Sequence, residues 1–177
     1  MMKNITYIVG ISASGKSTLT EQLVINDPKY IRCNRDALRE AFVPNHNEKW
    51  YSEEHKEFRA DREDLISHLL KAIELSNDFL IDDNTNLSWH FLEKALRGRN
   101  MVDVIITGAS FDPYLCIDRD AKRDRIVGET IILKQYREFI TLLVSLHDFI
   151  EANPDFSKNI KILEKDGRYN DFFSKGS

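Results

Sequence analysis

Short apolar runs alternate along the chain with longer segments in which apolar residues recur at helical spacing. The runs predict strands at residues 3–9, 30–34, 79–81, 102–107 and 159–163. The spaced segments predict helices at residues 16–26, 51–76, 87–99, 112–122 and 129–150, with a helical start at 35–40. Strands that alternate with helices usually run parallel in one sheet. The pattern therefore predicts a three-layer α/β/α sandwich, with a loosely structured tail after Asp166.

Two of the expected helices show which of their faces should be buried. In the first helix the expected apolar side consists of Leu19, Leu23 and Ile25. In the long helix at 51–76 it consists of Phe58, Leu65, Leu69, Ala72 and Ile73. The charged residues of that long helix are expected to form a solvated surface: Glu53, Glu54, Lys56, Glu57, Arg59, Asp61 and Arg62.

Between the first strand and the first helix lies Gly-Ile-Ser-Ala-Ser-Gly-Lys-Ser, residues 10–17, a full match to the phosphate-loop motif Gly-x-x-x-x-Gly-Lys-Ser/Thr. Glycines let the backbone wrap closely around phosphate oxygens, so that its amides point inward. Lys16 should reach the β- and γ-phosphates, and the Ser17 hydroxyl should hold Mg²⁺. The motif predicts that the chain binds ATP with Mg²⁺. The expected nucleotide contacts in this loop are Gly10, Ser12, Ala13, Ser14, Gly15, Lys16, Ser17 and Thr18.

Composition narrows the class of protein. With 177 residues, 42% hydrophobic and 31% charged, the chain suits a single soluble domain spanning residues 1–177. It contains no apolar run of membrane-spanning length and no room for a signal peptide, so no membrane partner is expected. Cys33 and Cys116 have no metal-type spacing and indicate buried thiols in a reducing, cytoplasmic setting. The net charge of −4 argues against a broad nucleic-acid-coating surface, so a polynucleotide would have to be gripped locally.

Just past the second expected strand lie Asp36 and Arg39, at the sheet edge where open α/β sheets bind ligands. Asp36 could accept the proton of an attacking hydroxyl, and Arg39, on the same helix face, could grip a phosphate of the acceptor. Two simpler interpretations stay open. Asp36 could serve only as a helix N-terminal acid, and the two residues could form a surface ion pair.

The third strand ends in Asp82-Asp83-Asn84-Thr85-Asn86. A carboxylate at this position could hold Mg²⁺ through water or brace the pair formed by Asp36 and Arg39. A turn followed by a helix N-cap would explain some of these residues, but not two adjacent acids after an apolar strand. The residues alone leave open which of the two acids is the functional one.

A basic segment with Arg119, Lys122, Arg123 and Arg125 separates two expected helices. In a kinase such a segment, here about residues 119–128, is expected to be a lid that closes over ATP and offsets its charge. Arg119 and Arg123 are four residues apart and are expected to share one inward helical face, with Gly128 as a hinge. A solvated, self-paired helix end is the alternative.

Taken together, the phosphate loop, Asn34-Arg35-Asp36-x-x-Arg39, Asp83-Asn84-Thr85-Asn86 and the basic lid followed by Gln135-Tyr136-Arg137-Glu138-Phe139 resemble the kinase domain of the polynucleotide 5′-hydroxyl kinases. The resemblance covers about residues 3–141 and implies a P-loop kinase fold. It implies that Asp36 is the general base, that Arg39 contacts the 3′-phosphate of the acceptor, and that Arg123 is the lid arginine beside Arg119. Asp83 fits the family pattern better than Asp82, and would contact metal or substrate together with Asn86.

The leading hypothesis is therefore ATP-dependent phosphorylation of a DNA or RNA 5′-hydroxyl end, as in nucleic-acid repair. A kinase of the same fold acting on another hydroxyl is the alternative, with a modified base, a nucleoside or a small molecule as acceptor. A third possibility is a regulatory module in which ATP drives a switch. All kinase hypotheses require Asp36 to face the γ-phosphate, with room for an alcohol between them. The sequence leaves the oligomeric state open.

Overall fold

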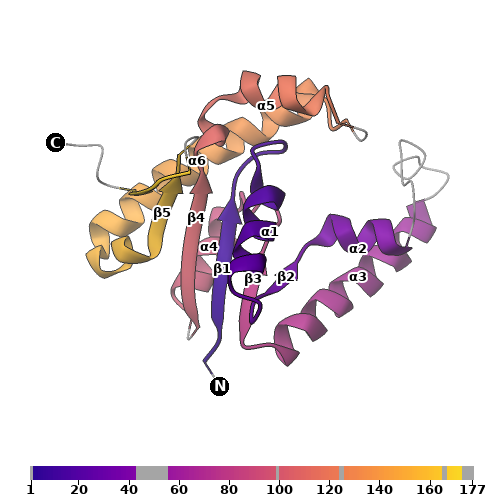
Figure 1. Ribbon diagram of the computed structural model, residues 1–177, viewed down its shortest axis with the longest axis horizontal. Coiled ribbons are helices and arrows are strands. Elements are labelled where there is room, and N and C mark those ends of the chain that lie inside the picture. Colours follow the sequence, from indigo (N-terminus) through magenta and orange to yellow (C-terminus); the bar gives the residue numbers. More distant parts are fainter. Residues whose placement is uncertain (1, 43–55, 99, 124–125, 165–166, 173–177) are drawn as a thin grey trace.

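One six-stranded sheet organises the computed structural model, which describes residues 2–42, 56–98, 100–123, 126–164 and 167–172 (Figure 1). The strand order is β2-β3-β1-β4-β5-β6. Every neighbouring pair is parallel except β5 with β6. The strands are β1 (Asn4–Val9), β2 (Ile31–Cys33), β3 (Phe79–Asp82), β4 (Met101–Thr107), β5 (Ile160–Leu163) and β6 (Tyr169–Asp171).

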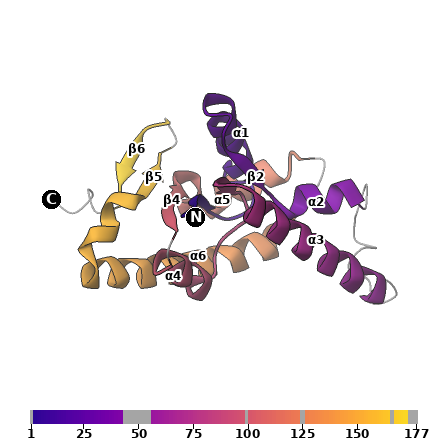
Figure 2. The same cartoon turned by 90° about the horizontal axis from the view of Figure 1, so that it is seen from below.

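Helices cover both faces of the sheet, which confirms the predicted three-layer fold (Figure 2). Successive strand residues point to opposite faces. Ile8 therefore packs with Leu19 of α1 on one face, while Val9 joins the larger core beneath α4 and α6 on the other. The helices are α1 (Lys16–Asn26), α2 (Arg35–Phe42), α3 (Lys56–Ser76), α4 (Trp89–Leu96), α5 (Pro113–Asp120) and α6 (Glu129–Ala152), with short 3₁₀ helices at Gly108–Phe111 and Pro154–Asn159.

An arm made of α2 and α3 projects beyond the β2 edge of the sheet, and its two helices lie side by side (Figures 1 and 2). The arm explains why the predicted buried face of α3 is wrong at Phe58, Leu65 and Ala72 but right at Ile73. Ile66 is fully buried, whereas Phe58 and Leu65 are exposed because the outer part of α3 has no sheet beneath it. Leu70 and Ile73 pack against the core. Ala72 is exposed as well.

Two further expectations are corrected. Ile25, placed on the apolar side of the first helix, is 76% exposed, because six residues of helix rotate it about 120° away from the direction of Leu19. The tail after Asp166 is not merely loose: Tyr169–Asp171 forms β6, antiparallel to β5. The Tyr-Asn-Asp sequence has no apolar run, so only the turn at Gly167 (φ 83°) and pairing with β5 reveal this strand.

Several expectations concern residues outside the described ranges: residues 51–55 of the long helix, with Glu53 and Glu54, and Arg125 of the lid. Cys33 and Cys116 are buried free thiols, as expected. Among the helices in the described ranges, none has both the length and the apolar character needed to cross a membrane.

Candidate active site

The phosphate loop joins β1 to α1 at the carboxyl edge of the sheet. Ala13 (φ 59°) and Gly15 (φ 92°) are left-handed, a conformation that lets successive amides turn toward one centre. A Cβ atom on Gly10 would come within 2.2 Å of the Thr107 hydroxyl, so this position requires glycine. The loop therefore has the close backbone approach that a phosphate cradle needs.

A buried cluster of hydroxyl groups ties the loop to the end of β4. The Thr107 Oγ1 atom lies 2.8 Å from the Ser14 hydroxyl and 2.7 Å from the Ser110 hydroxyl. Ser110 also accepts a hydrogen bond from the backbone N–H of Ile11 at 3.2 Å. The Ser14 side chain is thus a structural support of the loop. Sequence reasoning missed Thr107 and Ser110, although a threonine ending an apolar strand is a usable signal.

A second support comes from α6. The side-chain oxygen of Gln135 accepts a hydrogen bond from the backbone N–H of Ser12 at 2.8 Å. Gln135 follows the buried Ile132 by three residues and precedes the buried Phe139 by four, so it lies on the buried face of α6. A polar side chain at such a position was the available signal, but the sequence alone gave it no role.

Lys16 is buried at the centre of the site, and its ammonium donates to the Ile11 carbonyl at 2.7 Å. Burial lowers the pKa of Lys16 to about 8, against the opposing effect of the Asp83 carboxylate. The charge of Arg123 also lowers this pKa, while that of Asp36 raises it. Four charged residues singled out from the sequence are therefore close enough to interact electrostatically.

Asp83 is the better placed of the two adjacent acids for a metal. Its Oδ2 atom accepts hydrogen bonds from Arg32 Nε at 2.9 Å and Asn34 Nδ2 at 3.2 Å. Its Oδ1 atom is buried and has no hydrogen-bond partner among the described residues. A carboxylate oxygen and the Ser17 hydroxyl are the hard ligands that Mg²⁺ prefers, so the residues present fit this ion.

Asp82 points to the opposite face of the sheet and is held in the following turn. Its Oδ1 atom accepts from the Asn84 amide at 2.7 Å and from the Asn86 amide at 3.1 Å. Burial raises the pKa of Asp82, and these hydrogen bonds partly offset the shift. Asn86, expected to contact substrate, also donates to the Ile8 carbonyl at 3.1 Å, so its amide nitrogen braces the turn against β1.

Asp36 and Arg39 lie on the same side of α2, and their side chains form an ion pair. The Asp36 side chain is 59% exposed, and its charge is among those that raise the pKa of Lys16. Glu63 of α3 was not among the residues singled out from the sequence. Its carboxylate forms an ion pair with Arg39 and accepts a hydrogen bond from the Arg35 guanidinium at 2.9 Å. The hydrogen bond from Arg39 is the largest of the effects that lower the pKa of Glu63. Glu63 thus connects both arginines of α2 to α3.

The lid expectation needs one correction. The α5 helix ends at Asp120, so Arg119 lies in its last turn and Arg123 beyond it, and the two do not share a helical face. The buried Asp120 accepts hydrogen bonds from the backbone N–H groups of Val127 at 2.9 Å and Gly128 at 2.8 Å. Its carboxylate also lies 3.7 Å from the half-exposed Arg123 guanidinium. Asp120 therefore links the end of α5 to the residues that begin α6.

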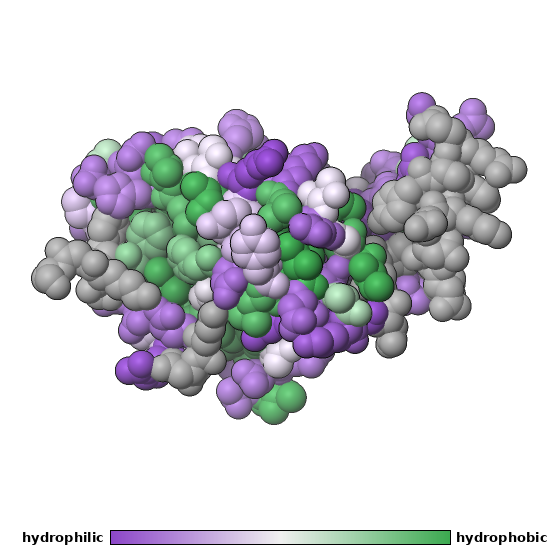
Figure 3. All heavy atoms as spheres, turned by 90° about the horizontal axis from the view of Figure 1, so that it is seen from above, coloured by the Kyte–Doolittle hydropathy of each residue, from purple (hydrophilic) through white to green (hydrophobic). Residues whose placement is uncertain are grey.

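The carboxyl edge of the sheet thus offers a phosphate cradle, a buried cation, a carboxylate oxygen with no hydrogen-bond partner in the described ranges, and a further exposed carboxylate. In the view from above, hydrophobic and hydrophilic residues are intermingled on the described surface (Figure 3). Such a set can bind a triphosphate and a divalent cation, and can remove a proton from a second ligand.

A family model described as an AAA domain (AAA_33) matches residues 5–141. No curated protein sequence matches the chain significantly. Among solved structures, a chain of the Pnkp1/Rnl/Hen1 RNA repair complex matches with a TM-score of 0.60 and 17% identity. That match covers 80% of this chain and 45% of the other, so the present chain spans less than half of that relative.

A second similar structure comes from the PezAT chromosomal toxin–antitoxin system of Streptococcus pneumoniae. Its TM-score is 0.59 at 13% identity, and the match covers 95% of this chain and 71% of the other. At these identities both likenesses show a shared fold. The family match, which spans most of the chain, goes further: the protein belongs to the AAA_33 family and is a nucleotide-binding, kinase-like P-loop domain.

Proposed function

We propose that this protein transfers the γ-phosphoryl group of ATP to the 5′-hydroxyl of a DNA or RNA end. The observation that carries the proposal is the convergence around Lys16: the charges of Asp83, Arg123 and Asp36 all act on its ammonium. A module that only binds nucleotide needs the cradle and its buried cation, but it does not need a further exposed carboxylate whose charge acts on that cation.

In the proposed step the acceptor hydroxyl lies between Asp36 and the γ-phosphorus. Its oxygen forms the new O–P bond while its proton passes to the Asp36 carboxylate. The bond from the γ-phosphorus to the bridging oxygen breaks, and ADP leaves with the electron pair. Lys16 and the loop amides hold the phosphates, and Arg123 offsets charge that develops on the transferred group.

A bound Mg²⁺ would neutralise phosphate charge, with Ser17 and Asp83 as the residues to hold it. Arg39 is proposed to contact a phosphate of the acceptor, a role that requires it to exchange Glu63 or Asp36 for that phosphate. Membership of a fold also found in an RNA repair complex supports a polynucleotide acceptor. The buried free thiols support a reducing, cytoplasmic setting.

The test is transfer of labelled phosphate from ATP to 5′-hydroxyl DNA and RNA oligonucleotides. Asp36→Asn should lower the transfer rate by about 100-fold or more, since a general base contributes that much, while ATP affinity stays within about threefold. Asp61→Asn removes an exposed acid from the arm and should leave both quantities unchanged. Unaltered turnover in Asp36→Asn would exclude Asp36 as the base.

The second candidate is a kinase of another hydroxyl. It is favoured by the fold shared with a toxin–antitoxin chain over 95% of this protein, and by the net charge of −4. Mapping the labelled product separates the two candidates. Phosphate on a hydroxymethyl base, a nucleoside or a small metabolite, with none on terminal ribose, would select the alternative.

A further inference from the structure

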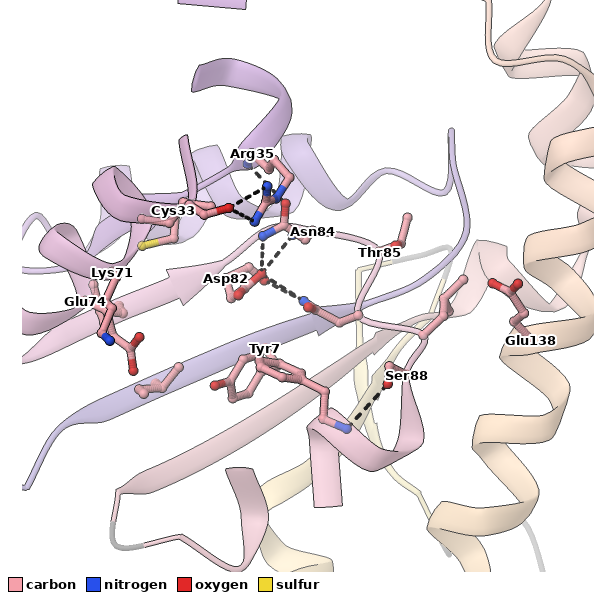
Figure 4. A pocket seen from close by; sticks show the side chains of 17 residues that line it. Tyr7, Cys33, Arg35, Lys71, Glu74, Asp82, Asn84, Thr85, Ser88 and Glu138 are labelled. Atoms are coloured by element: carbon pink, nitrogen blue, oxygen red, sulfur yellow. Dashed lines mark hydrogen bonds between the residues drawn. The ribbon is translucent and has the colours of Figure 1, made fainter. Parts of the chain in front are cut away.

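A cavity of about 900 Å³ lies against the face of the sheet that α1 does not cover (Figure 4). It is bounded by β1, β2 and β3 below, by α3 on one side and by the loop between β3 and α4 on the other. Its volume falls within the range of pockets that hold small organic ligands. Nothing in the proposed phosphoryl transfer uses this cavity.

The cavity walls suit a flat, largely apolar group. Tyr7 and Phe91 meet edge to face, with ring centroids 5.5 Å apart. Aliphatic side chains complete the walls: Ile5, Leu70, Leu80 and Leu87. Aromatic edges and aliphatic surfaces of this kind pack well against a planar heterocycle.

Unpaired hydrogen-bonding groups converge on the same space. Asp82 uses its Oδ1 atom within the turn, while its Oδ2 atom has no hydrogen-bond partner among the described residues. The Tyr7 hydroxyl also has none within those residues. Glu74 adds a second carboxylate at the end of the cavity away from Glu138 (Figure 4). The cavity therefore offers acceptors to a ligand that carries N–H donors.

The charge of the cavity floor argues against a phosphate as its occupant. Burial, followed by the charges of Asp82 and Glu74, raises the pKa of Tyr7 well above its usual range. Tyr7 thus remains protonated at neutral pH beside two carboxylates. The ionic lining residues are Arg35 and Lys71 against Glu74, Asp82 and Glu138, so carboxylates outnumber cations and the cavity favours neutral donors over anions.

The lining of the cavity extends to the residue that directly precedes the proposed base. Asn84, which lines the cavity, accepts a hydrogen bond from the backbone N–H of Arg35 at 3.1 Å. Arg35 lines the cavity as well and directly precedes Asp36. A ligand group held in the cavity would thus be connected over a short distance to a hydroxyl at Asp36.

We propose that this cavity binds the nucleobase of the terminal acceptor nucleotide, and that it prefers bases with an exocyclic amino group. The proposal rests on the proposed function, because it takes the acceptor to be a nucleotide end. Adenine, cytosine and guanine each carry an amino donor for Asp82 and Glu74. Uracil and thymine lack it, and their one ring N–H on this edge is flanked by two carbonyl oxygens that these carboxylates disfavour.

The first experiment compares 5′-hydroxyl oligonucleotides that differ only in the terminal residue: deoxyadenosine, thymidine or an abasic sugar. The kcat/KM of the wild-type protein should be about tenfold or more lower for the abasic end than for the adenine end, because the abasic end lacks a hydrogen bond to a charged group, and such a bond accounts for a factor of this size. Glu74→Gln and Tyr7→Phe should reduce that ratio. Asp64→Asn removes an exposed charge of α3 outside the cavity and should preserve it.

A binding measurement separates this proposal from the proposed function. Adenosine alone is titrated into the protein by calorimetry, with Phe91→Ala and Glu74→Gln as variants. Adenosine binding that both variants weaken supports the cavity even if no nucleic-acid end is phosphorylated. Equal phosphorylation of adenine and abasic ends, or adenosine binding unaffected by both variants, overturns the cavity assignment and leaves 5′-end transfer intact.

Discussion

Asp82 and Asp83 are adjacent in the chain and nevertheless belong to different environments. They follow one another at the end of a strand, so their side chains point to opposite faces of the sheet. Asp83 faces the phosphate loop, where its charge acts on Lys16, and Asp82 faces the cavity beside Tyr7. The sequence shows two acids after an apolar strand but not the register that gives each its side.

This difference predicts distinct responses to Mg²⁺. Asp83→Asn keeps the shape of the side chain but removes the charge beside Lys16. The Mg²⁺ concentration for half-maximal phosphoryl transfer should therefore rise about tenfold or more. Asp82→Asn should leave that midpoint unaltered, whatever its effect on acceptor use. A magnesium titration at fixed ATP checks both variants, and identical midpoints for the two would contradict the assignment of Asp83.

Among the elements, α5 and α6 show how one side chain organises the connecting segment. Gly128 has a φ of 95°, with open space where a Cβ atom would be, and begins α6 as its N-cap. Both its N–H and that of Val127 are held by Asp120 of α5. The basic residues made this segment recognisable from the sequence, whereas the acid that anchors it is visible only after folding.

Asp120→Ala should destabilise the protein by about 1–3 kcal/mol, because two half-buried N–H groups lose their acceptor. For a chain of this size that corresponds to a fall in Tm of roughly 2–12 °C. Asp118→Ala, two residues earlier, removes an exposed ion pair with Lys122 and should cost less than about 1 kcal/mol. Thermal unfolding and hydrogen exchange at the Val127 and Gly128 amides measure the effect; equal losses in both variants would refute the anchoring role.

At the scale of the whole molecule, nucleotide binding is coupled to folding and to pH through Lys16. Its pKa of about 8 in the free protein means that the ammonium is largely neutral at pH 9. A bound triphosphate favours the charged form, so binding above pH 8 takes up a proton. Below pH 8 the group is already charged, and its protonation does not alter affinity.

ATP with Mg²⁺ at about 100 times its Kd should stabilise the folded protein by about 2.7 kcal/mol at pH 7. Above pH 8 the affinity should fall by up to tenfold per pH unit, so the rise in Tm at fixed ATP should shrink. Lys16→Arg stays charged throughout, and its smaller rise in Tm should not change between pH 8 and 9.5. Thermal melts across this pH range test the coupling. If the increase in Tm caused by ATP is the same at every pH up to 9.5 in the wild-type protein, the coupling is excluded.

The sequence by itself determined the alternation of strands and helices, the phosphate loop and its flanks, and the places of Asp36 just past one strand and of the adjacent acids Asp82 and Asp83 at the end of another. These features are local, because hydrophobic periodicity and glycine geometry act over a few residues. Even the length of the first helix, residues 16–26, follows from the loop before it and the proline after it.

Only the tertiary structure decided which face of each element is buried and which distant side chains meet. The burial of Ile66 and the partners Glu63, Thr107 and Gln135 depend on contacts between segments far apart in the chain, and β6 depends on its pairing with β5. Local periodicity carries no information about such pairings, because the free energy that selects them comes from burial and hydrogen bonding across the assembled sheet.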